Sequence, residues 1–286
     1  MSADAGLIST SDPEPRRAEL PHGVVTYTDE GPAEAPVLIA VHGIPGSGRD
    51  FRYLAPQLLP ARRVVRVDLP GFGGSAPALD AIRTLRGRAR VVLALAEALG
   101  IDRFTILGHS MGGGTALVLA ADQPARVTGL VLVASLALRL HRGLGAPPRA
   151  FAWTARGLET PGLRRLLVPW VRREYRKRRF PGVEEKTAND FAHLMHALSA
   201  VDFEVMRAAV RGALPPALVA YARDDHMIET EVAEDLAAAI PGARVLAFDD
   251  GGHNIQKTRA VELGAAVRAL LLRGQRRESS AKPISL

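Results

Sequence analysis

The sequence predicts an α/β fold in which a doubly wound, mostly parallel sheet carries a helical cap insertion. Short β-branched runs alternate with longer stretches of helical periodicity along most of the chain. Most of these runs are continuously apolar, which is typical of strands covered on both faces. One interval, between about Leu136 and Leu214, contains no convincing strand. The alternation favours a doubly wound sheet, and the strandless interval favours a cap inserted between two of its strands.

The predicted elements follow in order and divide the chain into five parts. The strand candidates are rich in Val, Leu and Ile and lie at 24–28, 37–41, 63–67, 104–107, 129–133, 217–221 and 244–248. The helix candidates repeat apolar residues with helical spacing and lie at 49–59, 80–99, 111–122, 229–239 and 256–272. The parts are a flexible N-terminal tail (1–20), the first part of the core (21–135), the helical cap (136–214), the second part of the core (215–273) and a flexible C-terminal tail (274–286).

The composition sets limits on the class of protein. The chain has 286 residues, of which 47% are hydrophobic and 23% charged, so one large domain with a sizeable core is expected. It has no cysteine, which excludes disulfides, a cysteine nucleophile and thiolate metal sites. The N-terminus lacks the apolar run of a signal peptide, and no stretch reaches the ~18 apolar residues of a membrane span. We therefore expect a cytoplasmic protein, while the oligomeric state cannot be inferred from the sequence.

Basic residues are concentrated in the predicted cap. The segment 139–182 has 12 Lys or Arg and 2 Glu, whereas the rest of the chain has 25 basic and 28 acidic residues. This segment admits three interpretations: a solvated helix face, a lid that favours anionic substrates, and an amphipathic helix that contacts lipid headgroups. In the third interpretation the apolar side would consist of Trp153, Leu166, Leu167, Trp170 and Val171. Nucleic-acid binding is not expected, because aromatic residues are few and no recognition fold is present.

A serine surrounded by glycines lies where a predicted strand turns into a helix. Gly108, Ser110 and Gly112 form the pattern G-x-S-x-G, between the strand at 104–107 and the helix at 111–122. A turn this tight forces its middle residue into an unfavourable backbone conformation, and its neighbours must be small. The pattern predicts a nucleophilic hydroxyl held above the sheet at a helix N-terminus. The alternative is a structural turn in which Ser110 only caps the helix.

Candidate partners for Ser110 follow two later strands. Asp224 and Asp225 come directly after the strand at 217–221, and His253 follows the strand at 244–248. Because catalytic groups in such sheets gather at the carboxyl ends of the strands, all four side chains are expected at one edge. A serine hydroxyl needs a base, and the base needs an orienting acid. The order serine, acid, histidine is more specific than the pentapeptide alone.

Five stretches together resemble the α/β-hydrolase fold superfamily over nearly all of residues 22–273. They are HGIPGS (42–47), DLPGFGGS (68–75), GHSMGG (108–113), ARDDHMI (222–228) and GGHNIQ (251–256). The resemblance implies that Asp225 is the acid, although Ala222 stands where the family usually has glycine, so Asp224 is kept as the alternative. It further implies His253 as the general base. The backbone amides of Ile44 and Met111 would form the oxyanion hole.

The resemblance implies a serine hydrolase that cleaves a carboxylic ester or similar acyl bond through an acyl-enzyme, with no metal or organic cofactor. The expected partner is a small-molecule ester, anionic if the basic cap acts as a lid of that kind. Three alternatives remain: a ring-fission hydrolase of carbon–carbon bonds, a cofactor-free haloperoxidase or perhydrolase, and a non-catalytic binding protein of the same fold. The usual Trp after the catalytic His of ring-fission hydrolases is Asn254 here. The sequence does not name the substrate or its acyl-chain length.

Two further patterns are weaker indicators of a functional site. The stretch GFGGSA (71–76) fits a dinucleotide-binding pattern, but Pro70 and Pro77 flank it and no helix opens directly after it. We instead expect Asp68 to anchor this loop. His193 and His196 have helical spacing but no nearby carboxylate at ligand spacing, so ordinary packing is the expected role.

Overall fold

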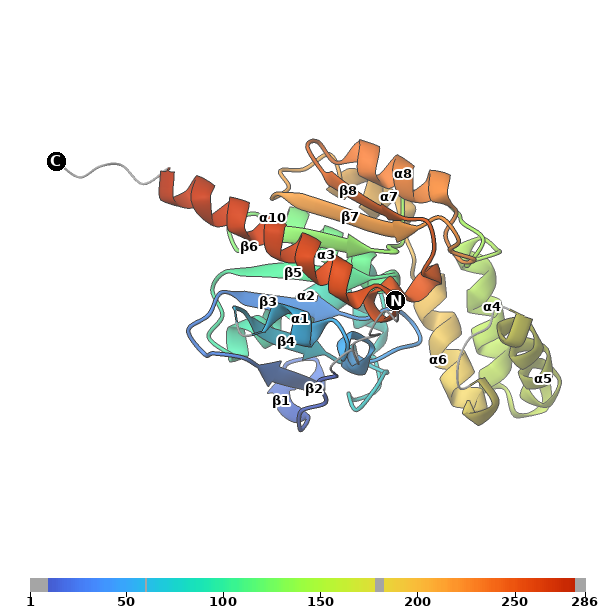
Figure 1. The fold of residues 1–286 in the computed structure, drawn as a ribbon. Helices are drawn as coiled ribbons and strands as arrows, with labels where there is room; N and C mark the ends of the chain where they lie inside the picture. The colour runs from blue at the N-terminus through green and yellow to red at the C-terminus, as the bar shows by residue number, and fades with distance from the viewer. Residues whose placement is uncertain (1–9, 60, 178–182, 281–286) are drawn as a thin grey trace, which may run out of the picture.

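A computed structural model describes residues 10–59, 61–177 and 183–280 and contains one eight-stranded sheet (Figure 1). The strands lie in the order β1-β2-β4-β3-β5-β6-β7-β8, and all neighbours from β4 onward are parallel. Their bounds are β1 Arg16–Leu20, β2 Gly23–Glu30, β3 Val37–Val41, β4 Arg63–Val67, β5 Phe104–His109, β6 Val127–Val133, β7 Ala217–Ala222 and β8 Arg244–Phe248. The predicted fold class is therefore confirmed.

The sequence predicts a flexible tail over residues 1–20, but this is wrong for residues 16–20. They form β1, which pairs antiparallel with β2 from Arg16 opposite Tyr27 to Leu20 opposite Gly23. Only Ala18 and Leu20 turn inward and pack against the core, while the other three side chains are exposed. Charged residues on the outer positions of an edge strand are common because they discourage pairing with other chains. That polarity makes the segment look like a tail in the sequence.

Helices cover both faces of the sheet, which gives two separate apolar layers. The alternation of side chains along each strand divides the core, as in β3, where Leu38 faces one layer and Ile39 the other. The core helices are α1 Ala55–Leu58, α2 Leu85–Ala98, α3 Met111–Asp122, α8 Thr230–Ala239, α9 Ile255–Thr258 and α10 Ala260–Ser280. Helices α1 and α10 pack on the Leu38 side, and α2, α3 and α8 on the Ile39 side.

Three helix predictions differ from the structure at their ends. The stretch 49–59 contains a short 3₁₀ helix, Gly48–Phe51, before α1. The stretch 80–99 begins with a 3₁₀ turn, and α2 starts only after Thr84, whose hydroxyl accepts from the Gly87 amide at 2.9 Å. Helix α10 continues to Ser280, through most of the predicted C-terminal tail. Gln, Arg and Glu are good helix formers, so the polar composition of that tail does not end the helix.

Residues 136–214 lie between β6 and β7 and include four helices; the first three project beyond the carboxyl edge of the sheet, whereas the fourth packs on α3 (Figure 1). They are α4 Pro148–Glu159, α5 Pro161–Lys177, α6 Ala188–Ser199 and α7 Phe203–Ala209. Helix α5 is the outermost, with α4 and α6 between it and the sheet. Among the described residues, no helix is long and apolar enough to cross a membrane.

Candidate active site

Ser110 occupies the single residue between β5 and α3, and its backbone is strained. Its φ of 52° and ψ of −122° lie in a region that L-residues seldom adopt. The amide of Ser110 donates to the Val133 carbonyl at 3.0 Å, and its carbonyl accepts from the Leu136 amide at 2.8 Å. Strain of about 1–3 kcal/mol persists only where surrounding structure fixes it, and these bonds to the end of β6 supply that constraint.

The glycines around Ser110 are required by close contacts with the backbone and with one side chain. A Cβ on Gly108 would meet the carbonyl of Gly112, and one on Gly112 would meet the carbonyls of Val41 and His42. A Cβ on Gly113 would collide with the Ser135 side chain. These approaches let α3 start directly above the strand ends, so its N-terminal amides face the same space as the Ser110 hydroxyl.

Ser110, His253 and Asp225 form a continuous hydrogen-bonded chain. The Ser110 hydroxyl lies 3.0 Å from His253 Nε2, and His253 Nδ1 lies 2.9 Å from Asp225 Oδ2. Asp225 follows β7 and His253 lies in the 3₁₀ turn Gly252–Asn254 after β8, so the strand order brings all three to one edge. The other carboxylate oxygen of Asp225 accepts from the amides of Met227 at 2.7 Å and Ile228 at 3.1 Å.

Asp224 is not part of the hydrogen-bonded chain from Ser110 to Asp225. Its Oδ1 accepts from the Gly252 amide at 2.7 Å, so it holds the turn that carries His253 without touching the imidazole. The two carboxylates after β8 also have other partners: Asp249 pairs with Arg223 and Asp250 with Arg259. The geometry therefore favours Asp225 over Asp224 as the partner of His253.

The pKa values of Asp225 and of His109, which lies beside His253, are both lowered, but for different reasons. Burial acts to raise the pKa of Asp225, but the hydrogen bond and charge of His253 and the two backbone amides outweigh it and lower that pKa. Next to His253, with ring centroids 5.0 Å apart, lies His109. Burial, reinforced by the charge of His253, lowers the pKa of His109 to about 3. His109 is thus neutral at pH 7, and its Nε2–H donates to the His253 carbonyl at 2.9 Å.

The loop after β3 lies directly against Ser110. A Cβ on Gly43 would come within 2.8 Å of the Ser110 Cβ, so the loop approaches Ser110 closely at the residue before Ile44. Met111 begins α3, and the first N–H groups of a helix have no intrahelical acceptor. His42 braces the loop, because its Nε2 accepts from the Leu69 amide at 2.9 Å and its Nδ1–H donates to the Gly43 carbonyl at 2.6 Å.

One cavity lies between the core and the cap, and a second lies within the cap. The first, of about 410 Å³, is bounded by the loops at 45–47 and 71–73 and by cap residues including Tyr175 and Phe191. The second, of about 220 Å³, also has Tyr175 in its wall. Sequence motifs do not reveal these wall residues, because the packing of α5 on α6 brings Tyr175 and Phe191 together. His193 of the cap also reaches the core, where the Ala78 amide donates to its Nε2 at 3.3 Å.

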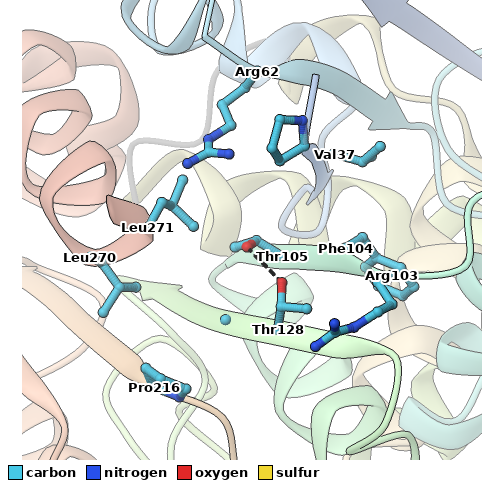
Figure 2. A pocket seen from close by; sticks show the side chains of 11 residues that line it. Val37, Arg62, Arg103, Phe104, Thr105, Thr128, Pro216, Leu270 and Leu271 are labelled. Atoms are coloured by element: carbon cyan, nitrogen blue, oxygen red, sulfur yellow. Dashed lines mark hydrogen bonds between the residues drawn. The ribbon is translucent and has the colours of Figure 1, made fainter. Parts of the chain in front are cut away.

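A third cavity, of about 180 Å³, belongs to the opposite edge of the sheet (Figure 2). Arg62 and Arg103 are among its lining side chains, with Thr105 Oγ1 and Thr128 Oγ1 3.4 Å apart. It lies where β3, β5 and β6 begin, whereas Ser110 follows the end of β5. This cavity is therefore not part of the candidate active site.

The residues of the two weaker sequence patterns have structural partners. Asp68 accepts from the Gly48 amide at 2.7 Å and the Gly74 amide at 2.8 Å, so it anchors the glycine-rich loop as expected. His196 pairs with Glu159 of α4 at 2.7 Å. His193 thus links the cap to the core, and His196 links two helices of the cap.

Comparisons with known proteins agree with this architecture. The family model described as alpha/beta hydrolase fold matches residues 36–260. The chain is 30% identical over 278 residues to the dihydrolipoyllysine-residue acetyltransferase component of the acetoin cleaving system of Pseudomonas putida, covering 94% of this chain and 72% of that protein. It is 30% identical over 244 residues to the putative carbamate hydrolase RutD of Klebsiella pneumoniae (strain 342), covering 79% and 87%.

Two further proteins are similar over most of their length. A 2-hydroxymuconate semialdehyde hydrolase of Pseudomonas sp. (strain CF600) is 29% identical over 271 residues, covering 90% of this chain and 94% of that protein. A crystal structure of a hydrolase from Pseudomonas aeruginosa PA01 superposes with a TM-score of 0.72 at 24% identity, covering 90% of this chain and 98% of that chain. At this identity the superposition shows the fold alone.

We expect Gly112→Ala to lower the free energy of unfolding by about 3 kcal/mol, because its Cβ would strike the backbone of β3. Gly162→Ala is the matched control, since nothing lies within 4 Å of a Cβ there, and its change should stay under about 1 kcal/mol. Urea denaturation of both variants measures the difference. Equal stabilities would contradict the claim that close backbone contacts exclude a side chain at Gly112.

His109 should make the fold less stable in acid. The unfolded chain binds a proton at this residue below about pH 6.5, whereas the folded protein does not until about pH 3, so stability falls as pH decreases. Between pH 7 and pH 5, His109→Gln should lose about 2 kcal/mol less stability than wild type. Denaturant unfolding at the two pH values checks this, and identical losses in both proteins would show that His109 titrates normally.

Proposed function

The chain belongs to the alpha/beta hydrolase fold family, and from that premise we propose that it is a serine hydrolase that cleaves a carboxylic ester or similar acyl bond. The observation that carries the proposal is the chain from Ser110 to His253 to Asp225, with contacts of 3.0 and 2.9 Å. A nucleophile, a base and an orienting acid at these distances are the groups that acyl transfer requires.

In the proposed reaction Ser110 Oγ attacks the substrate carbonyl carbon while His253 Nε2 accepts the hydroxyl proton. Asp225 fixes the imidazole with Nδ1 protonated and stabilises the imidazolium that forms. The amides of Ile44 and Met111 donate to the developing oxyanion, an interaction for which each donor is worth about 10²–10³ in turnover. His253 then protonates the leaving group, and water activated by the same imidazole releases the acid from Ser110.

The neutral state of His109 supports a single-base mechanism. A second imidazolium 5.0 Å from His253 would oppose protonation of the base during the reaction. Burial prevents this by lowering the pKa of His109 to about 3. His253 can therefore gain a proton next to a neutral ring and an ionised Asp225.

Carbon–carbon bond hydrolysis is the second candidate activity. The observation that favours it is the similarity to a 2-hydroxymuconate semialdehyde hydrolase over 94% of that protein's length. Asn254, in place of the expected Trp after His253, disfavours it. Parallel assays with p-nitrophenyl esters and with 2-hydroxymuconate semialdehyde separate the two, because the proposal requires ester turnover to exceed carbon–carbon cleavage.

A matched pair of substitutions tests the proposal. Asp225→Asn should lower kcat for p-nitrophenyl acetate and butyrate by about 10⁴-fold. The side-chain oxygen would stay with the Met227 and Ile228 amides, so the NH₂ group would face His253 Nδ1 and hold the imidazole in the wrong tautomer. Asp224→Asn keeps an acceptor for the Gly252 amide and should change kcat little.

Ser110→Ala completes the test, since it removes the nucleophile and should abolish turnover above the residual level of the binding site. The proposal fails if wild type turns over no ester, or if Ser110→Ala retains wild-type kcat. Equal losses in Asp224→Asn and Asp225→Asn would contradict the assignment of the acid.

A further inference from the structure

The hairpin of α4 and α5 exposes four large apolar side chains. The exposed fraction is 75% for Trp153, 75% for Leu166, 52% for Trp170 and 51% for Leu163. Three of them recur along α5 at spacings of three and four residues, so they share one face of that helix. Isolated exposed apolar residues are ordinary, but a group containing two tryptophans on one hairpin marks an interaction surface.

The opposite face of α5 is already satisfied. Val171 and Tyr175 are buried, and the Tyr175 ring packs 6.3 Å from that of Phe191. Gly157 of α4 leaves room for Leu167, which packs between the two helices. Leu167 and Val171, which the sequence suggested for the lipid-facing side, thus belong to the inside of the cap. The exposed apolar residues of α5 lie on the outermost helix of the cap (Figure 1).

The charges on α4 and α5 that lack an ion-pair partner in the described part of the chain are all positive, because the two acidic residues of these helices, Glu159 and Glu174, pair with His196 and Lys177. Five exposed arginines on α4 and α5 have no ion-pair partner among the described residues: Arg149, Arg156, Arg164, Arg165 and Arg173. The basic residues that are paired lie together at the end of α5, where Arg172 and Arg176 contact Glu184 and Lys177 contacts Glu174. The two helices that carry the apolar face therefore also carry an excess of positive charge without ion-pair partners among the described residues, and Arg156 lies over the ring of Trp153.

We propose that the α4–α5 hairpin docks on the surface of an anionic lipid bilayer. A helix with Trp and Leu on one side and unpaired Arg at its border is suited to the headgroup region, where the rings enter the interface and the guanidinium groups meet lipid phosphates. A second copy of the chain fits less well, because a two-fold contact through this face would bring its arginines against each other. In this arrangement the hairpin binds at the surface of the bilayer and does not cross it.

Docking would place one wall of the cap cavity at the lipid. Trp170 is half-exposed on the docking face, and it also lines the cavity of about 220 Å³ together with Phe151 and Met195. An apolar chain that leaves the bilayer beside Trp170 would enter this cavity. Gly143 lines the cavity, and its amide donates to the carbonyl of Met227, two residues after Asp225. The favoured substrate is then an ester with an apolar chain, and this step rests on the proposed function.

Vesicle sedimentation tests the docking surface. Wild type should bind phosphatidylcholine vesicles that contain phosphatidylglycerol, bind pure phosphatidylcholine vesicles weakly, and be released as salt rises from about 50 to about 500 mM. The double variant R164E/R165E should weaken binding by about 25-fold or more, at about fivefold for each charge removed. L163S/L166S should also weaken it, because the apolar contact is lost.

The matched control is R17E/R244E, which changes net charge equally at the exposed edge strands β1 and β8 and should leave vesicle binding unchanged. Circular dichroism verifies that each variant is folded. Absence of binding to anionic vesicles by folded wild type overturns the proposal. An equal loss in R17E/R244E overturns it too, because net charge and not this surface would then control binding. A dimer that dissociates in L163S/L166S, without vesicle binding, assigns the face to a second copy instead.

An activity arm separates docking from the proposed function. If both hold, R164E/R165E should lower the ratio of the hydrolysis rate for a long-chain ester in anionic vesicles to that for p-nitrophenyl acetate. Vesicle binding that follows the variants without any ester turnover supports docking and removes the hydrolase proposal. Ester turnover with no vesicle binding by wild type does the reverse.

Discussion

The turn from β5 into α3 takes place at one residue, and the arrangement of the candidate active site depends on it. Ser110 is held at a positive φ by hydrogen bonds to the end of β6, and the backbone contacts at Gly108 and Gly112 leave no space for a longer turn. The hydroxyl is therefore fixed above the carboxyl edge of the sheet. Because β6, β7 and β8 follow β5 in order across the sheet, their loops can deliver an acid and a base to that point.

Backbone amides and loop-to-loop bonds hold the other groups in place. Asp225 receives two amides from its own loop, while Asp224 ties that loop to the turn carrying His253. His42 and Asp68 similarly connect the loops after β3 and β4. Burial keeps His109 neutral beside the base, and the pKa of Asp225 stays low despite burial. The site is thus preorganised by groups that do not themselves react.

The sequence predicted those features that depend on local pattern. Apolar runs identified seven of the eight strands, and the glycine spacing placed the tight turn from strand to helix at Ser110. It missed β1, because only Ala18 and Leu20 face inward on that edge strand. It left Asp224 and Asp225 open, because adjacent residues differ only in the direction of their side chains. The position of Tyr175 in the walls of both cavities could not be predicted from the sequence, because it follows from helix packing within the cap.

The central claim is that the strained corner presents Ser110 as an activated nucleophile. Reaction with a fluorophosphonate, followed by intact-mass measurement and peptide mapping, tests it most directly because the reagent requires an activated hydroxyl and no knowledge of the substrate. The account predicts one adduct for each chain, on the peptide that contains Ser110, and slow labelling when His253 is replaced by Ala. Absence of an adduct, or modification at another serine that persists in Ser110→Ala, would contradict it.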